Sequence, residues 1–385
     1  MNALLRATAA LAGLAAPLAL DLRVRRSAQP LTDAWQTLPV ARRGDTLLGL
    51  SLRPRQMAAF GLEPLRTAAE LLAFPFQVVR LGAYWRLMEP SPDAFVADEL
   101  DRLVALAEQA GKQIILAVGA VKTFGYPEFF VPEFYQAGAF REGTRVHAND
   151  QPRLLEAACR FVTRVVERYR GHAAVIAWQV EHEALDPLGM EHSWRLAEDF
   201  VAREMAAVRA ADPTRPILLN GFLGNSALAA ATQGWRTRDQ GDSLAGAQRQ
   251  GDWVGVDYYP RHALFSLGPA SIYLDGSGTP WQAARRRRLA ETAQARGQRL
   301  LVSEGQAEPW EAVTTPPDPR AAAMASCLPE HLIANYNQWL RPGALGAGRL
   351  FAYLFWGADY WVQRQRSGDA SYLAAFRRLV EESAG

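Results

Sequence analysis

Eight short apolar runs alternate with longer segments of helical periodicity, and this alternation constrains the fold more than any other feature of the sequence. The runs are rich in Val, Ile and Leu and nearly continuous, as strands buried on both faces must be. They cover residues 46–52, 77–82, 113–119, 175–180, 216–220, 252–257, 299–303 and 350–356.

The segments between the runs predict helices over residues 95–111, 153–170, 191–212, 281–297 and 321–340. Strand–helix alternation favours parallel pairing with crossover helices. Eight such units predict an α/β protein with a single (β/α)₈ barrel spanning residues 46–385. A doubly wound open sheet is the alternative, but it needs a glycine-rich turn after its first strand, and residues 50–54 (Leu-Ser-Leu-Arg-Pro) do not supply one.

The first 20 residues have the pattern of a targeting segment. Arg6 precedes an apolar stretch over residues 7–20, as in a signal peptide, and the stretch is short for a membrane-spanning helix. We therefore expect residues 1–20 to be a signal peptide or an N-terminal membrane anchor. The expected localisation is secreted, periplasmic or attached to the cell envelope. Residues 21–45 are polar and irregular, which predicts a linker.

Composition excludes several classes of partner. The 385 residues include 42 Lys and Arg against 40 Asp and Glu, a net charge of +2. No nucleic-acid partner is expected. The one dense basic run, residues 285–288, lies within a predicted helix and is interpreted as the solvent-exposed face of that helix. The two cysteines do not form a disulfide framework, and the six histidines lack metal-ligand spacing. We expect no metal and no cofactor, and the oligomeric state stays open.

Carboxylates follow the fourth and seventh apolar runs, at the barrel end where chemistry takes place. Glu181, His182 and Glu183 follow the fourth run, and Glu304 follows the seventh. Retaining glycoside hydrolysis needs two carboxyl groups, one to protonate the leaving oxygen and one to attack the anomeric carbon. Alternation along a strand points Glu181 and Glu183 to the same side, so either fits the acid. Glu308 is an alternative to Glu304 but lies further into its loop.

Two segments resemble motifs of clan A glycoside hydrolases, which include the cellulase family five and the beta-galactosidase family forty-two. Residues 171–183, Gly-His-Ala-Ala-Val-Ile-Ala-Trp-Gln-Val-Glu-His-Glu, are similar to the fourth-strand signature of that clan. Residues 300–305, Leu-Leu-Val-Ser-Glu-Gly, are similar to its seventh-strand nucleophile motif. The resemblance spans roughly residues 46–365. It implies that Glu183 is the acid/base and Glu304 the nucleophile.

The same resemblance implies a set of substrate-binding residues. Arg80 matches the arginine that steadies the nucleophile, and Trp356 matches the tryptophan of the sugar subsite. His182 departs from the pattern, because most of the clan has Asn there to bind the sugar 2-hydroxyl, although the mannanase family twenty-six carries His. Tryptophan is abundant, and its faces stack on sugar rings or fill the core. The full predicted set is Arg80, Trp85, Lys122, His182, Tyr258, Tyr259, Trp310 and Trp356.

Two other function classes are alternatives to a glycosidase. A non-catalytic carbohydrate-binding barrel agrees with the His182 departure but predicts a broken carboxylate pair, and both carboxylates are present. A phosphate-handling isomerase needs a glycine-rich loop after the last strands, where Gly305 and Gly357 stand singly. The sequence favours a retaining O-glycosidase that acts on a β-linked oligosaccharide or polysaccharide. The sugar, the linkage, endo or exo action, and transglycosylation stay open.

Overall fold

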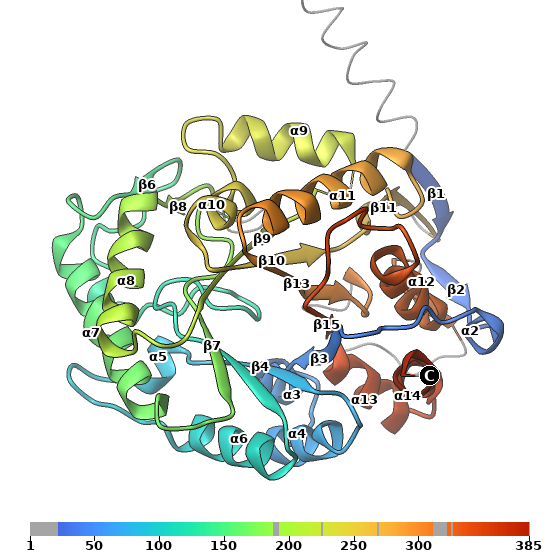
Figure 1. Ribbon diagram of the computed structural model, residues 1–385, viewed down its shortest axis with the longest axis horizontal. Coiled ribbons are helices and arrows are strands. Elements are labelled where there is room, and N and C mark those ends of the chain that lie inside the picture. Colours follow the sequence, from blue (N-terminus) through green and yellow to red (C-terminus); the bar gives the residue numbers. More distant parts are fainter. Residues whose placement is uncertain are drawn as a thin grey trace, which may run out of the picture.

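The computed structural model describes residues 22–187, 192–224, 226–267, 269–310, 322–324 and 326–384. Eight parallel strands in this part of the chain form a closed barrel (Figure 1). They are β3 (Leu47–Ser51), β4 (Val78–Gly82), β5 (Gln113–Ala117), β7 (Val175–Gln179), β9 (Ile217–Phe222), β10 (Trp253–Tyr258), β13 (Arg299–Gln306) and β15 (Ala352–Trp356).

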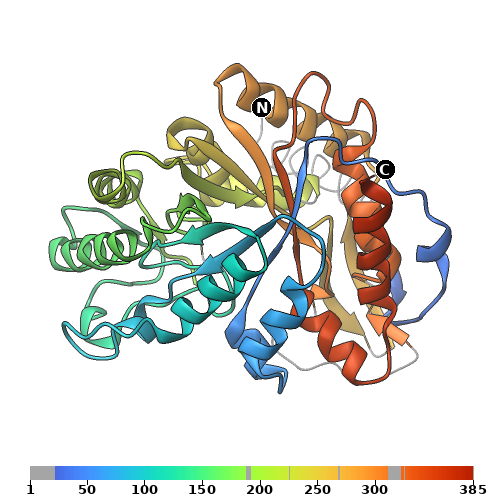
Figure 2. The ribbon, with the colours of Figure 1, turned by 60° about the horizontal axis from the view of Figure 1, so that its bottom comes forward.

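The barrel strands are neighbours in the order in which the chain visits them, and pairing of β15 with β3 closes the ring. Each of the eight predicted runs overlaps one of these strands, so the (β/α)₈ prediction is confirmed. The runs form strands because their apolar side chains are covered on both faces, by the barrel interior and by the surrounding helices. Figure 2 shows the helices lying outside the strands.

The helices follow the strands in alternation. They are α3 (Pro54–Ala59), α4 (Pro64–Leu72), α5 (Trp85–Met88), α6 (Asp98–Gln109), α7 (Pro152–Tyr169), α8 (Glu198–Ala211), α9 (Ala227–Arg236), α10 (Ser243–Gln250), α11 (Pro280–Ala295), α12 (Pro329–Leu340), α13 (Ala358–Arg366) and α14 (Ser371–Ser383). Each predicted helical segment overlaps one of them. The helix expected over residues 321–340 begins later than predicted, because Pro329 occupies its first turn.

Short elements decorate this frame, including a 3₁₀ turn, η1 (Glu133–Tyr135), and a hairpin of β11 (Arg261–Leu267) and β12 (Ala270–Asp275). The paired strands β6 (Arg145–Val146) and β8 (Arg195–Leu196) join two loops at the carboxyl end of the barrel. The long loops expected at residues 123–150 and 258–280 therefore carry local structure of their own.

Residues 22–45 differ from the irregular linker that we predicted. This segment contains β1 (Leu22–Arg26), β2 (Ala28–Pro30) and α2 (Ala34–Thr37). Strand β1 pairs with β12, and β2 pairs with β14 (Ala322–Met324). The pairing partners lie more than 200 residues away, so local sequence could not indicate them. The predicted leader, residues 1–20, lies outside the described residues.

The core has two apolar layers. One lies inside the barrel and includes Val78, Ile115, Leu218 and Leu301, and the larger one lies between strands and helices. Both cysteines are free thiols, with Cys327 buried and Cys159 half-buried. Among the described helices, none is long and apolar enough to cross a membrane.

Candidate active site

The barrel interior changes from apolar to polar toward the carboxyl ends of the strands. Side chains alternate between the two faces of a strand, so residues two apart share the interior face. Val78, Ala177, Leu218 and Trp253 belong to the interior apolar layer. Two residues further along the same strands come Arg80, Gln179, Asn220 and Gly255, and two further on β10 comes Asp257. All but the glycine are buried polar residues, so this end of the barrel holds a polar cluster.

A β-bulge positions Glu304. The register between β10 and β13 shifts so that Val256 pairs with Val302 and Asp257 pairs with Glu304, leaving Ser303 as the extra residue. A bulge of this kind redirects the side chains that follow it. The Ser303 hydroxyl donates to Asp257 Oδ1 at 2.8 Å, and Glu304 reaches the polar cluster as well.

The carboxylate of Glu304 is held by two donors. Arg80 Nη1 donates to Oε1 at 2.7 Å, and the Tyr259 hydroxyl donates to Oε2 at 2.6 Å. Arg80 is itself oriented by Gln179, whose Oε1 accepts from Arg80 Nε at 2.7 Å. Charge-assisted hydrogen bonds of this kind favour the ionised carboxylate. Glu304 is therefore prepared to act as an anion.

The backbone after β7 separates the two neighbouring glutamates. Glu181 and Glu183 have φ angles of +57° and +44°, in the left-handed region that non-glycine residues rarely adopt. The alternation of an extended strand is broken there, so the two side chains do not share a face. Glu181 turns away from the cluster, and its two oxygens accept from the backbone N–H groups of Val121 and Lys122.

This turn depends on Gly119. A Cβ atom at that position would stand 2.0 Å from the Glu181 nitrogen, so only glycine allows the two chain segments to approach so closely. Glu181 also meets the buried Glu204 of α8, and burial and Glu181 raise the pKa of Glu204 well above its usual value. Both oxygens of Glu181 are thus occupied by backbone donors, whereas Glu183 lies beside His182 and Asp257 in the polar cluster.

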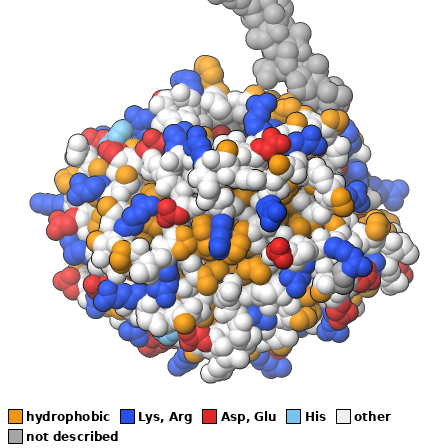
Figure 3. Space-filling model, viewed as in Figure 1, with side chains coloured by type: hydrophobic (Ala, Val, Ile, Leu, Met, Phe, Trp, Pro, Cys, Tyr) orange, Lys and Arg blue, Asp and Glu red, His pale blue; other side chains and the backbone are white. Residues whose placement is uncertain are grey.

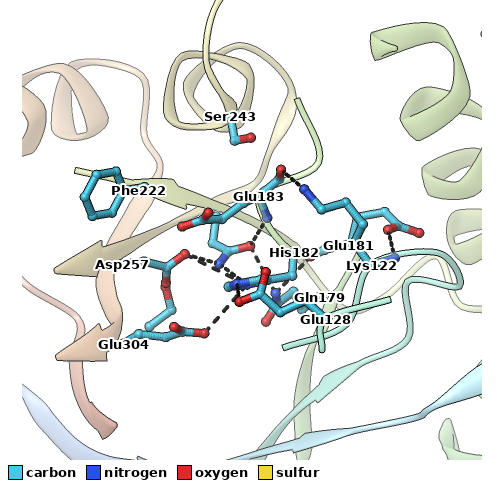
Figure 4. A network of polar contacts seen from close by, with 12 residues as sticks. Lys122, Glu128, Gln179, Glu181, His182, Glu183, Phe222, Ser243, Asp257 and Glu304 are labelled. Atoms are coloured by element: carbon cyan, nitrogen blue, oxygen red, sulfur yellow. Dashed lines mark hydrogen bonds and ion pairs between the residues drawn. The ribbon is translucent and has the colours of Figure 1, made fainter. Parts of the chain in front are cut away.

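Glu183 faces the polar cluster together with Asp257 and Glu304 (Figure 4). Burial, followed by the nearby carboxylates of Asp257, Asp186 and Glu128, raises the pKa of Glu183 well above its usual value. Lys122 opposes this shift. The two predicted catalytic glutamates thus have different neighbours: acidic groups surround Glu183, whereas Arg80 and Tyr259 donate to Glu304.

His182 is a neutral imidazole with a defined tautomer. Asn220 Oδ1 accepts from the backbone N–H of Glu183 at 3.3 Å, which fixes the amide so that Nδ2 points to His182. Asn220 Nδ2 and Arg80 Nη2 lie 2.9 and 3.4 Å from His182 Nδ1. Because both neighbours are N–H donors, Nδ1 is the acceptor and the proton is on Nε2. Burial and the positive charges of Arg80 and Lys122 hold the pKa of His182 well below its usual value.

One atom each from His182, Glu183 and Asp257 lie within 4.8 Å of one another, the single group in the described part of the chain with metal-ligand spacing. The donor set does not suit a cation. Nδ1 of His182 faces two N–H donors, and each oxygen of Asp257 already accepts a hydrogen bond, from Ser303 and from Asn220. The cluster is instead connected by hydrogen bonds.

Three aromatic residues lie at the barrel mouth. Tyr259 and Trp356 belong to one apolar cluster, and the Arg53 guanidinium stacks over the Trp356 ring at 4.4 Å. Trp310 packs edge-on against Tyr259 and keeps 38% of its surface exposed. Glu308, the alternative to Glu304, accepts two hydrogen bonds from Arg53 and is not free to act as a nucleophile.

Three predicted substrate-binding residues lie elsewhere. Trp85 stacks between Tyr135 and Phe161 in the core outside the barrel. Tyr258, one residue before Tyr259, points outward and packs against Trp339.

Lys122 is the third of these residues. It is buried, and its ammonium donates to the backbone carbonyls of Glu183 and Asp186. It therefore supports the loop after β7. The positions of these three side chains give no support to a direct contact with substrate, because register and loop geometry direct them to other partners.

Sequence reasoning missed Asp257 and Asn220 as members of the site. Asp257 is completely buried, and burial together with Glu304 raises its pKa to about 8. Asn220 links Gln179, His182, Glu183 and Asp257 in one network. The signal was present, because each is a polar residue at the interior position near the end of an apolar strand.

Comparison with known proteins supports the resemblance drawn from the strand motifs. A family model described as beta-galactosidase, glycoside hydrolase family 42, matches residues 68–222. Beta-galactosidase BgaB from Geobacillus sp. (strain Y412MC61) is 30% identical over 115 residues, which cover 28% of this chain and 17% of that protein. The corresponding protein of Geobacillus kaustophilus is 29% identical over a stretch with the same coverage. The chain thus matches less than a fifth of the length of these relatives.

Solved structures share the fold at low sequence identity. GH5_18 from Streptomyces cattleya, in complex with GlcNAc, has a TM-score of 0.55 and 15% identity, covering 88% of this chain and 81% of that chain. Exo-beta-1,4-mannosidase Op5Man5 from Opitutaceae bacterium strain TAV5 has a TM-score of 0.54 and 14% identity, covering 92% and 63%. Xylanase 10B from Thermotoga petrophila RKU-1 has a TM-score of 0.53 and 12% identity, covering 91% and 99%.

Proposed function

We propose that the protein is a retaining glycoside hydrolase that cleaves β-glycosidic bonds, with Glu183 as acid/base and Glu304 as nucleophile. The observation that carries the proposal is the contrast between these two carboxyl groups at one barrel mouth. Burial and neighbouring acids raise the pKa of Glu183, which favours the protonated form, while Arg80 and Tyr259 donate to Glu304. Two carboxyl groups in different surroundings, one among acids and one held by donors, are the arrangement that this chemistry requires.

The reaction would proceed in two steps. Glu304 attacks the anomeric carbon while Glu183 protonates the departing oxygen, which gives a covalent glycosyl-enzyme. Glu183, now ionised, accepts a proton from water as the water attacks the same carbon from the other side. Two inversions at one carbon give net retention.

The two proposed catalytic glutamates have a common neighbour in His182. His182 Nδ1 lies 3.6 Å from Glu304 Oε1, and atoms of His182, Glu183 and Asp257 lie within 4.8 Å of one another. Both glutamates therefore adjoin the same imidazole at one barrel mouth. The proposed double displacement requires carboxyl groups about 5–5.5 Å apart, whereas inverting enzymes keep them about 6.5–9.5 Å apart to hold a water molecule.

The substrate is proposed to be a β-linked oligosaccharide or polysaccharide. The similarity to beta-galactosidases over part of the chain supports a β-glycoside. His182 would present its Nε2–H to a sugar hydroxyl, the contact that an Asn side chain makes elsewhere in the clan. Trp310, which keeps 38% of its surface exposed, is proposed to stack on the sugar. Trp356 is 6% exposed and has Arg53 over its ring, so its proposed contact with the sugar is limited to the part that stays open.

The test is an activity screen on aryl β-glycosides and β-linked polysaccharides, with product anomers followed by NMR. We expect hydrolysis with retention by the wild type and at least a 10³-fold loss for Glu304→Gln. Glu156→Gln, at a side chain that is 72% exposed, is the matched control and should behave as wild type. Initial release of the inverted anomer would reject the double displacement. Sugar binding without turnover on any substrate would favour a non-catalytic carbohydrate-binding barrel.

A further inference from the structure

Asp257 is a buried carboxylate at the centre of the site that the proposed reaction does not use. It ends the interior face of β10, pairs in register with Glu304, and faces Glu183 (Figure 4). A carboxylate placed beside an acid and a nucleophile adds like charge to both, and this lowers the stability of the fold. We therefore ask what Asp257 does in the site. The hydrogen bonds of Asp257 indicate whether it donates to Glu183 or accepts from it.

Both oxygens of Asp257 already accept. Ser303 Oγ donates to Oδ1 at 2.8 Å, and Asn220 Nδ2 donates to Oδ2 at 2.5 Å. The orientation of the Asn220 amide is set independently, since its Oδ1 accepts from the backbone N–H of Glu183 and from Gln179 Nε2. Burial and Glu304 raise the pKa of Asp257 to about 8, but its hydrogen bonds with Ser303 and with Glu183 act in the opposite direction and favour the anion. In its contact with Glu183, Asp257 is therefore assigned as the acceptor, and Glu183 carries the hydrogen.

We propose that Asp257 is a positioning residue that keeps the catalytic proton on Glu183 by accepting it in a carboxyl–carboxylate hydrogen bond. This inference rests on the proposed function and goes beyond it, because it names the residue that, after burial, contributes most to the proton affinity of the acid. When a glycosidic oxygen occupies the mouth, the Glu183 O–H turns from Asp257 to that oxygen. The proton then moves to the leaving group as the bond to the anomeric carbon breaks.

The other charged groups around Glu183 do not replace Asp257. Those that affect its pKa are Asp257 on β10, Asp186 and Lys122 in the adjoining loops, and Glu128 in the loop after β5. After burial, Asp257 has the largest effect. The ammonium of Lys122 donates to the backbone carbonyls of Glu183 and Asp186. The backbone N–H of Ser243 donates to the carboxylate of Asp186. His182 is neutral and accepts at Nδ1.

The experiment compares the pH dependence of kcat/KM in the wild type and in Asp257→Asn. Removing the negative charge should lower the pKa of Glu183, so the alkaline limb should move to lower pH by about one to three units. Above that limb, the loss should be larger for alkyl than for activated aryl leaving groups. Asp252→Asn is the matched control: the same substitution on a half-exposed residue just before the opposite end of β10 should leave the limb in place.

A second measurement does not depend on activity. Carboxyl ¹³C NMR of the wild type, with resonances assigned through Glu183→Gln and Asp257→Asn, should show Glu183 retaining its proton to higher pH than Asp257. A uniform loss of kcat/KM with an unmoved limb would overturn the proposal, as would a titration in which Asp257 releases its proton last. The titration decides the question even if Asp257→Asn does not fold, or if no glycoside is hydrolysed and the proposed function fails.

Discussion

At the scale of single residues, hydrogen-bond partners distinguish the two proposed catalytic glutamates more clearly than their position along the strands does. Glu183 is surrounded by carboxylates and tends to hold a proton, whereas Glu304 receives donors from Arg80 and Tyr259. Glu181 lies close to Glu183 in the sequence, and Glu308 lies close to Glu304. Their oxygens are nevertheless occupied, by backbone amides in Glu181 and by Arg53 in Glu308. The proposed chemistry at this mouth therefore depends on which carboxyl groups face the polar cluster and which are bound by structural partners.

The acid/base role of Glu183 predicts a dependence on the leaving group. Glu183→Ala should lower kcat/KM by about 10²–10⁴-fold on alkyl glycosides, because general acid catalysis contributes that much. The loss should be smallest with an activated aryl leaving group, which needs little protonation. Added azide should partly restore turnover and yield a β-glycosyl azide, since a small anion needs no general base. Equal losses on all substrates without azide rescue would remove Glu183 from this role.

The two adjacent tyrosines offer a matched pair. Tyr259→Phe removes the donor to Glu304 Oε2, and a hydrogen bond to a charged group is worth about 1.5–3 kcal/mol, so kcat/KM should fall roughly 10- to 100-fold. Tyr258→Phe changes a side chain that packs against Trp339 outside the barrel, so kcat/KM should stay near wild type. Steady-state kinetics at matched thermal stability compares the two. Equal effects would mean that the hydroxyl of Tyr259 does not act through Glu304.

At the scale of elements, two local departures from regular geometry build the site. The bulge in β13 brings both Ser303 and Glu304 to the polar cluster, and the left-handed residues after β7 send Glu181 and Glu183 in different directions. Regular strands would place one residue in two inside the barrel. The site therefore depends on contacts between neighbouring strands and loops that hold these departures in place.

Gly119 is one such contact, and its substitution tests the element scale. Gly119→Ala would place a methyl group against the backbone of Glu181, so we expect a loss of about 1–3 kcal/mol in stability and a displaced Glu183 with reduced kcat. Gly171→Ala is the control, because nothing lies within 4 Å of the added Cβ. Thermal unfolding and kinetics measure both effects. A Gly119→Ala variant with wild-type stability and activity would show that the close approach is not required.

At the scale of the whole molecule, the barrel serves as a frame that brings distant residues to one mouth. Arg80, His182, Asp257 and Glu304 come from β4, the loop after β7, β10 and β13, and they meet because parallel strands end on the same side. On the face shown in Figure 3, basic and acidic side chains are interspersed, consistent with the small net charge. Binding to a neutral sugar polymer needs no large field of one sign.

We also propose that residues 1–20 direct the protein out of the cytoplasm, because Arg6 and the apolar stretch that follows form the pattern of a signal peptide or anchor. Fractionation of the native host should place the protein in the secreted, periplasmic or envelope fraction. A chain beginning at residue 22 should stay in the cytoplasm. Recovery of the full chain from the cytoplasm with Met1 intact would reject the proposal.

The sequence alone determined the barrel and the position of its reactive end. Each predicted strand was found, because nearly continuous apolar runs have few ways to be covered other than between a barrel interior and a ring of helices. It also indicated Glu183, Glu304, Arg80 and His182, which follow or end these runs and lie together in the structure.

Only the tertiary structure decided which way individual side chains point. Trp85, Lys122 and Tyr258 stand beside the right strands but turn into the core, the backbone or the helices. In the sequence, Asp257 is only the last residue of an apolar run. Its proposed role depends on Ser303, Asn220 and Glu183, which the fold brings around it. The physical reason is that burial is encoded locally by apolar pattern, whereas a bulge, a left-handed residue or a proton shared between strands depends on neighbours far along the chain.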